Sequence, residues 1–307
     1  MCYPQNNRLY FNRWCDEGVR FFLESSASVP GSTLHLVVTP AKVLGSNDAA
    51  ALFVPSTESV NKIYIAIEEI LSWLTIERYS YQMQLSRLDL CRNVGLQDQR
   101  YIDAYIRLLK KGSSATGWKV QSYPEGDERN AHSFRRISRY YQVTVYDKLY
   151  QIKREGYHTD YDGTRRILRV EVSILRPGIQ EELSRCKANI DNRWPYQLLE
   201  LAANGVSTMR RVLRRLVSDM PYYTLSAIRE YLGTTDISNA KRKNLLDFLE
   251  KINRYDLLDK KRIKEKFENG KKRLKQLKKL GINPVTIEAR AGIPYLPSLE
   301  QLIAAGL

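Results

Sequence analysis

Residues 140–148 read Tyr-Tyr-Gln-Val-Thr-Val-Tyr-Asp-Lys, and the alternation within them decides the fold class. Side chains on a β-strand point to opposite faces in turn, so Val143 and Val145 share one face. An apolar face opposite a polar one is typical of an antiparallel or mixed sheet that is covered on one side only. The stretch therefore predicts a strand with Tyr146 and Lys148 on its open face. The polar side chains on that face are Gln142, Thr144, Tyr146 and Lys148.

Three other stretches, at 33–38, 85–91 and 169–174, alternate in the same way. Asp89 stands in mid-strand between two leucines, and because aspartate is a poor strand former, it needs a reason to be there. A metal ion or an arginine partner would supply that reason. If all four strands join one sheet, its open face collects His35, Asp89, Tyr146, Lys148 and Glu171.

Periodicity also predicts helices that cover the apolar side of this sheet. Ser56 is a good N-cap for a helix that continues to about Thr75. A second helix is expected over Gln97–Lys111, where Gly112 stops it. A further helix is expected near Asp16–Glu24. The expected strands are Thr33–Thr39, Gln84–Arg92, Gly117–Tyr123, Arg139–Lys148 and Arg166–Leu175.

The pattern after Ile179 is helical throughout. We therefore expect a boundary near residue 178, between an α+β domain at 1–178 and an all-helical region at 179–307. The predicted fold class is α+β: an antiparallel or mixed sheet covered by helices on one face, followed by the helical region.

The 307-residue chain is strongly basic, with 49 Lys+Arg against 34 Asp+Glu and a formal net charge of +15. Such an excess favours a polyanionic partner, most often nucleic acid, and the tyrosines can stack on unpaired bases. No apolar run of about 18 residues and no secretion signal occurs, so we expect no membrane partner and a cytoplasmic location. The cysteines form no CxxC pair, which argues against a zinc knuckle or a disulfide framework.

Five short motifs follow one another along the chain. They are Thr39-Pro40-Ala41-Lys42-Val43-Leu44; Ser86-Arg87-Leu88-Asp89; Ser138-Arg139 followed by Val143–Lys148; Leu168-Arg169-Val170-Glu171; and the pair Ala240-Lys241-Arg242 and Lys279-Leu280-Gly281-Ile282. In this order and spacing they resemble the gene II/X replication proteins of filamentous bacteriophages. The segment Gly45–Asp48 departs from that family, because it lacks the histidine often found there.

The resemblance implies a rolling-circle replication initiator, related to plasmid Rep proteins and relaxases. Such an enzyme nicks and rejoins one strand of origin DNA through a covalent 5′-phosphotyrosine. Tyr146 matches the family's nucleophile, and Lys148 matches the lysine two residues beyond it. The implied partners are origin DNA, as duplex and as nicked single strand, and a host helicase and polymerase in the cytoplasm of a bacterial cell.

A phenol titrates near pH 10, so Tyr146 needs help to attack at neutral pH. Lys148 can stabilise the phenolate or the phosphate, and a divalent cation can polarise the phosphodiester. Asp89, Glu171 and His35 offer the oxygen and imidazole ligands that suit Mg²⁺ or Mn²⁺. We therefore expect these three residues to hold the cation.

Basic residues gather in the helical region. The range Lys260–Lys279 carries eleven Lys and Arg, and a helix there would present them to phosphates. A second cluster lies at 210–215 on another expected helix. The candidate DNA-binding residues are Arg87, Arg139, Arg210, Arg211, Arg214, Lys271, Lys272 and Lys275.

Three other functions fit parts of the pattern. A conjugative or plasmid relaxase would use the same chemistry, so these residues do not separate it from an initiator. A non-catalytic DNA-binding protein would keep the fold as a platform, although the position of Tyr146 and Lys148 favours an enzyme. An RNA-binding structural protein is favoured by the charge alone.

Overall fold

The computed structural model describes residues 2–5, 8–11, 13–26, 29–76, 83–112, 115–186, 193–254, 263 and 267–305. The chain forms two compact units, each built from separate stretches. The first unit comprises Met1–Leu85, Ile152–Asp162 and Cys186–Ala202; the second comprises Ser86–Gln151, Gly163–Arg185 and Ala203–Leu307. This division differs from the predicted boundary near residue 178, because residues 203–307 belong to the same unit as the strand that contains Tyr146, whereas residues 186–202 belong to the first unit.

The first unit contains a four-stranded antiparallel sheet in the order β1-β2-β3-β4. Its strands are β1 (Cys2–Gln5), β2 (Arg8–Phe11), β3 (Val19–Ser26) and β4 (Val29–Val38). The short helix α1 (Pro40–Val43) follows β4, and then comes α2 (Thr57–Trp73). Ser56 caps α2 as predicted, because its side chain accepts from the Ser59 amide. Apolar side chains of α2 and β4 form one core cluster.

Two predictions for this region were wrong. The range Asp16–Glu24 was expected to contain a helix, but its second half belongs to β3. Aromatic side chains favour the strand, because Phe21 stacks on Phe11 of β2 with ring centroids 4.6 Å apart. The strand that contains His35 was expected beside that of Tyr146, but it lies in this separate sheet.

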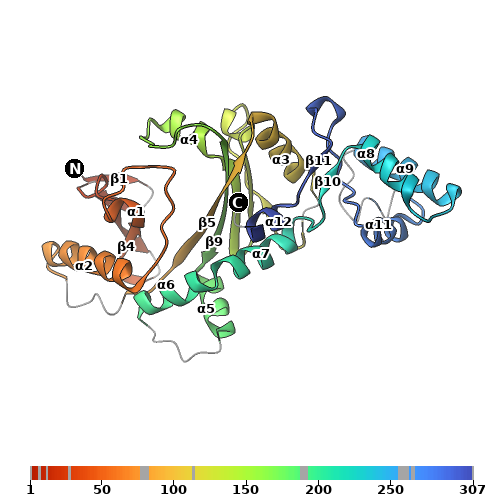
Figure 1. Ribbon diagram of the computed structural model, residues 1–307. Helices are drawn as coiled ribbons and strands as arrows, with labels where there is room; N and C mark the ends of the chain where they lie inside the picture. The colour runs from red at the N-terminus through yellow and green to blue at the C-terminus, as the bar shows by residue number, and fades with distance from the viewer. Residues whose placement is uncertain are drawn as a thin grey trace. The chain divides into compact units, whose positions relative to one another are not determined.

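The second unit contains a five-stranded antiparallel sheet in the order β5-β9-β8-β7-β6. Figure 1 labels its neighbouring strands β5 and β9. Its strands are β5 (Arg87–Leu96), β6 (Lys119–Val120), β7 (Ser133–Ile137), β8 (Tyr141–Asp147) and β9 (Arg166–Leu175). Val143 and Val145 are fully buried on its apolar face. The helix α3 (Gln99–Lys111) packs on that face, and its cap at Asp98 and its end at Gly112 are close to those predicted. The predicted α+β class, with an antiparallel sheet covered on one face, is confirmed.

Helices dominate the chain after β9, as predicted. They are α5 (Arg176–Arg185), α6 (Trp194–Ala203), α7 (Gly205–Leu216), α8 (Leu225–Thr234), α9 (Asn239–Arg254), α11 (Gly270–Lys279) and α12 (Leu299–Ala305). Two short strands, β10 (Tyr222–Tyr223) and β11 (Tyr295–Leu296), interrupt them. Within the second unit, α5 contacts β9, and α12 contacts both α7 and β5.

Candidate active site on the polar face of the sheet

The register of the five-stranded sheet brings polar side chains together in rows. One row contains Asn93, Arg169, Tyr146 and Ser133, on β5, β9, β8 and β7. The next row contains Cys91, Glu171, Thr144 and Arg135, and a third contains Asp89, Ser173 and Gln142. Residues directly opposite each other in a sheet share a face. Asp89, Tyr146 and Glu171 therefore lie on one face, as the alternation predicts.

Tyr146 and Glu171 form the central contact of this polar face. The Tyr146 hydroxyl donates a hydrogen bond to Glu171 Oε1 over 2.6 Å. Burial raises the pKa of Tyr146 above its ordinary value, and the negative charge of Glu171 raises it further. Arg169, the register partner of Tyr146, acts in the opposite direction and lowers this pKa. The tyrosine is thus a neutral hydroxyl with a proton acceptor and a cation beside it.

The sheet places Arg169 opposite Tyr146 and Arg135 in the neighbouring row of the same face, and sequence reasoning missed both as candidates. Arg169 is 7% exposed, and its Nε donates to Asn93 Oδ1 over 2.8 Å. Arg135 lies across from Thr144, one row away from Tyr146. Its buried Nε has no hydrogen-bond partner among the residues that the structure describes. The alternation within Ser133–Ile137 was the signal available for Arg135, but that strand was not predicted.

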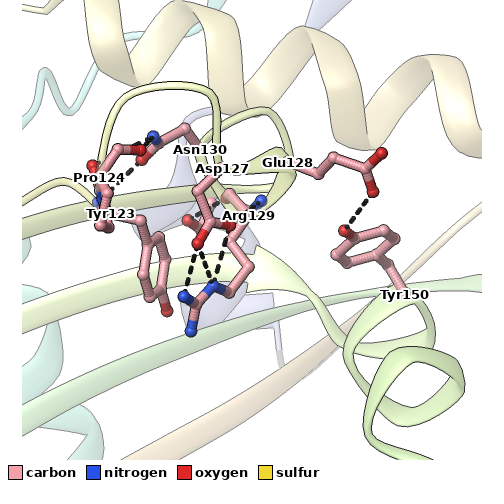
Figure 2. A network of polar contacts seen from close by, with 8 residues as sticks. Tyr123, Pro124, Asp127, Glu128, Arg129, Asn130 and Tyr150 are labelled. Atoms are coloured by element: carbon pink, nitrogen blue, oxygen red, sulfur yellow. Dashed lines mark hydrogen bonds and ion pairs between the residues drawn. The ribbon is translucent and has the colours of Figure 1, made fainter.

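A tightly bonded loop precedes β7 at the Tyr146 end of the sheet (Figure 2). Asn130 Oδ1 accepts from the Tyr123 amide over 2.9 Å, and its Nδ2 donates to the Pro124 carbonyl over 3.0 Å. The Arg129 guanidinium lies 3.9 Å from the centre of the Tyr123 ring, and that of Arg135 lies 5.0 Å from it. The loop therefore orients Arg135 through the Tyr123 ring.

Lys148 does not extend β8, so the prediction that it shares a strand face with Tyr146 was wrong. The strand ends at Asp147, and Lys148 is the first residue of α4 (Lys148–Glu155). Asp147 Oδ1 accepts from the Tyr150 amide over 3.0 Å, which satisfies a free donor of the first helical turn. Lys148 is 5% exposed, and its Nζ donates to Gln151 Oε1 over 2.9 Å.

The three predicted metal ligands do not fit a metal site. Both carboxylate oxygens of Asp89 are bound by Arg87, at 2.7 and 3.0 Å. His35 belongs to the sheet of the first unit, where its Nε2 lies 3.1 Å from Glu24. Glu171 is bound by Tyr146. Within the described residues, no three His, Cys, Asp or Glu side chains form a group able to hold a metal ion.

The arginines predicted to bind DNA mostly face partners inside the protein. Arg210 and Arg214 on α7 both bind Glu300 of α12, the latter at 2.6 Å. Arg211 binds Glu182, a buried carboxylate that also accepts from Tyr141 and Thr208. These contacts fasten α7 to its neighbours. By contrast, Arg139 is exposed in the turn before β8, and Lys271, Lys272 and Lys275 are exposed on α11.

The described part of the chain contains no helix that is both long and apolar enough to cross a membrane. A comparison with known proteins adds no relative: no protein-family model matches the chain, nor does any curated protein or solved structure.

Proposed function

We propose that this protein is a DNA nickase that initiates rolling-circle replication, with Tyr146 as the nucleophile. The observation that carries the proposal is the 2.6 Å hydrogen bond from the Tyr146 hydroxyl to Glu171. A hydroxyl nucleophile beside a proton acceptor, with a cation such as Arg169 acting on it, is an arrangement that suits nucleophilic catalysis on a phosphate. The excess of basic residues over acidic ones supports a DNA substrate.

In the proposed step, Tyr146 Oη attacks the phosphorus of one phosphodiester, and its proton moves to Glu171. The bond from phosphorus to the 3′ oxygen breaks, and that oxygen takes up a proton. The products are a 5′-phosphotyrosine and a free 3′ hydroxyl. Attack by that hydroxyl on the phosphotyrosine reverses the step and rejoins the strand.

Arg135 and Arg169 are the cations that we assign to the scissile phosphate. A positive charge placed where negative charge develops lowers the barrier of such a transfer. The predicted ligands of Mg²⁺ or Mn²⁺ do not fit a metal site, so this scheme routes no step through a metal. That a divalent cation assists nicking stays a prediction, and nicking assays with EDTA against added Mg²⁺ or Mn²⁺ test it.

The expected result of the direct test is a covalent adduct. Supercoiled and single-stranded DNA of the replicon that encodes the chain is incubated with the protein, denatured and digested with protease. We expect 5′-labelled DNA to remain attached to a peptide that contains Tyr146. An adduct on a different tyrosine contradicts the site assignment. Efficient nicking without any adduct contradicts the mechanism, because hydrolysis would then replace transfer to tyrosine.

Two other functions use parts of the same structure. A conjugative or plasmid relaxase would employ the same tyrosine and base, and transfer of the nicked strand to a recipient cell distinguishes it. A non-catalytic DNA-binding protein is favoured by the exposed lysines of α11, which stand apart from the Tyr146 site in the sequence. Absence of any adduct, with tight DNA binding retained, would select this second function.

The lysines of α11 allow a prediction about DNA affinity. Replacing Lys271, Lys272 and Lys275 by glutamine is expected to weaken duplex binding, because neutral side chains no longer displace counterions from the phosphates. The salt slope should fall by about one unit for each phosphate that the variant no longer binds. Fluorescence anisotropy at several salt concentrations measures this slope.

The control for this experiment is the double variant Arg210→Gln/Arg214→Gln, with circular dichroism to show that the protein stays folded without the contacts that fasten α7 to α12. It also removes positive charge from the second unit, but from side chains that bind Glu300. We expect an unchanged salt slope for the control. The same flattening per charge removed in both variants would mean that the α11 lysines act only through the overall charge of the protein.

A further inference from the structure

The helices α8 and α9 are joined by only four residues, Thr235-Asp236-Ile237-Ser238. The two helices pack on each other, and α11 packs on α9. Two packed helices with such a short turn occur in αα-hairpins and in the helix-turn-helix motif, and in the latter the second helix enters the major groove of DNA. Such helix pairs are common in proteins. A pair that reads DNA also needs a fixed turn and a second helix that exposes suitable side chains.

Arg242 fixes the turn between the two helices. Its Nε donates to the Leu232 carbonyl over 2.7 Å, and one of its terminal nitrogens donates to the Gly233 carbonyl over 3.3 Å. These carbonyls belong to the last turn of α8, where no helical donor remains for them. The other terminal nitrogen donates to Asn239 Oδ1 over 3.1 Å. A residue of α9 thus caps α8 and sets the direction in which α9 starts.

The two faces of α9 differ sharply. Its inner face is apolar and fully packed, with Leu245, Phe248, Leu249 and Ile252 at most 1% exposed. Its outer face, over the first two turns, consists of exposed residues at the spacing i, i+3, i+4 and i+7 that places them on one side of a helix. These residues are Ala240, Lys243, Asn244 and Asp247.

The first two turns of α9 expose side chains of the kinds that bind duplex DNA. Lys243 and Asn244 lie on the outer face with Asp247, and Lys241 is exposed in the same first turns, whereas the Arg242 side chain is directed to α8. Among the described residues, Lys243 and Asn244 form no ion pair or side-chain hydrogen bond. Lysine binds guanine and asparagine binds adenine in the major groove. An asparagine in the interior of a helix is otherwise unfavourable, because it is a weak helix former.

We infer that the outer face of α9 is a sequence-reading surface for duplex DNA, with Lys243 and Asn244 contacting base edges and Arg242 positioning the helix. The lysines of α11 add contacts to phosphates. This inference rests on the proposed function only for the biological identity of the DNA, because the surface reads a duplex whether or not Tyr146 cuts it.

The test uses the full chain carrying Tyr146→Phe, so that binding is measured without cutting. A pool of duplexes with a random central segment is selected for binding, and the enriched duplex is compared with a scrambled one of equal length. We expect an enriched sequence to emerge. Asn244→Ala should then lower the preference for that sequence by roughly ten-fold, the effect expected when one base is no longer read. Lys243→Gln should lower the preference and reduce the salt slope by about one unit.

The matched control is Lys153→Gln, which removes a lysine that is also exposed, from the last turn of α4. We expect it to leave the preference unchanged. The inference is overturned if no sequence is enriched, or if both α9 variants keep the full preference of the parent chain. An enriched sequence that depends on Asn244, together with no DNA adduct on the wild-type chain in the separate adduct assay, would refute the proposed function and leave this inference standing. An adduct on Tyr146 of the wild-type chain, with the full sequence preference kept by both α9 variants, would support the proposed function and overturn this inference.

Discussion

Replacing Tyr146 by phenylalanine is expected to lower the nicking rate by about 10⁴-fold or more and to leave no covalent adduct. The substitution removes a single oxygen, and that oxygen is the proposed attacking atom. Since the ring still fills the same space between β9 and β7, duplex affinity should not change. The two readouts are the initial rate of nicking on supercoiled DNA and the anisotropy of a labelled duplex.

The same variant tests whether the Tyr146–Glu171 contact also stabilises the fold. Loss of a hydrogen bond to a carboxylate costs about 1.5–3 kcal/mol. Urea unfolding should therefore show a modest decrease in the free energy of unfolding, too small to explain a loss of nicking through unfolding. A decrease large enough to unfold the protein at assay temperature would make the activity result uninformative, and circular dichroism detects it.

Tyr150→Phe is the matched control for this prediction. Tyr150 also donates to a carboxylate, Glu128, at 3.3 Å (Figure 2), and its ring stacks on His132. It lies on α4 rather than on the polar face of the sheet. We expect Tyr150→Phe to nick at the normal rate. If Tyr150→Phe is inactive while Tyr146→Phe nicks normally, the nucleophile has been assigned to the wrong tyrosine.

The local pattern of the chain predicts the second unit's sheet well. Alternation over two residues is a property of each strand by itself, so the faces of β8 and β9 could be read directly. It correctly places Tyr146, Asp89 and Glu171 on one side. The same pattern also occurs in β4, and nothing local distinguishes a strand of one sheet from a strand of another. This is why His35 was assigned to the wrong sheet.

The contacts of charged side chains were much less predictable. The basic cluster around Arg210 looks like a DNA-binding surface in the sequence, but its partners Glu182 and Glu300 are distant along the chain. Pairing of this kind depends on tertiary packing. The pair of Arg87 and Asp89 is different: the two residues are neighbours on one strand face, and an arginine partner was one of the two reasons that the sequence offered for Asp89. The end of the strand at Asp147 and the start of a helix at Lys148 were also not predictable. They depend on the Asp147 carboxylate, which accepts a hydrogen bond from the Tyr150 amide.

Replacing Glu171 by glutamine is expected to reduce the nicking rate by about 10²–10⁴-fold near neutral pH, the range for loss of a general base. Glutamine keeps the size of the side chain and an oxygen that can still accept from the tyrosine hydroxyl. It loses the negative charge and the ability to take up the proton. The fold and the duplex affinity should therefore be retained.

The pH profile separates this role from a merely structural one. The charge of Glu171 raises the pKa of Tyr146, so its removal lowers that pKa toward the ordinary value. Without an internal base, the Glu171→Gln variant must react through the fraction of Tyr146 that is already a phenolate. The nicking rate of this variant should therefore rise about ten-fold per pH unit at any pH below the pKa of Tyr146. The pKa of an unperturbed phenol is near 10. The wild-type protein should show no such climb between about pH 7 and 9, because Glu171 takes the proton there. If the Glu171→Gln variant is slower than the wild-type protein by the same factor at every pH, Glu171 only positions Tyr146.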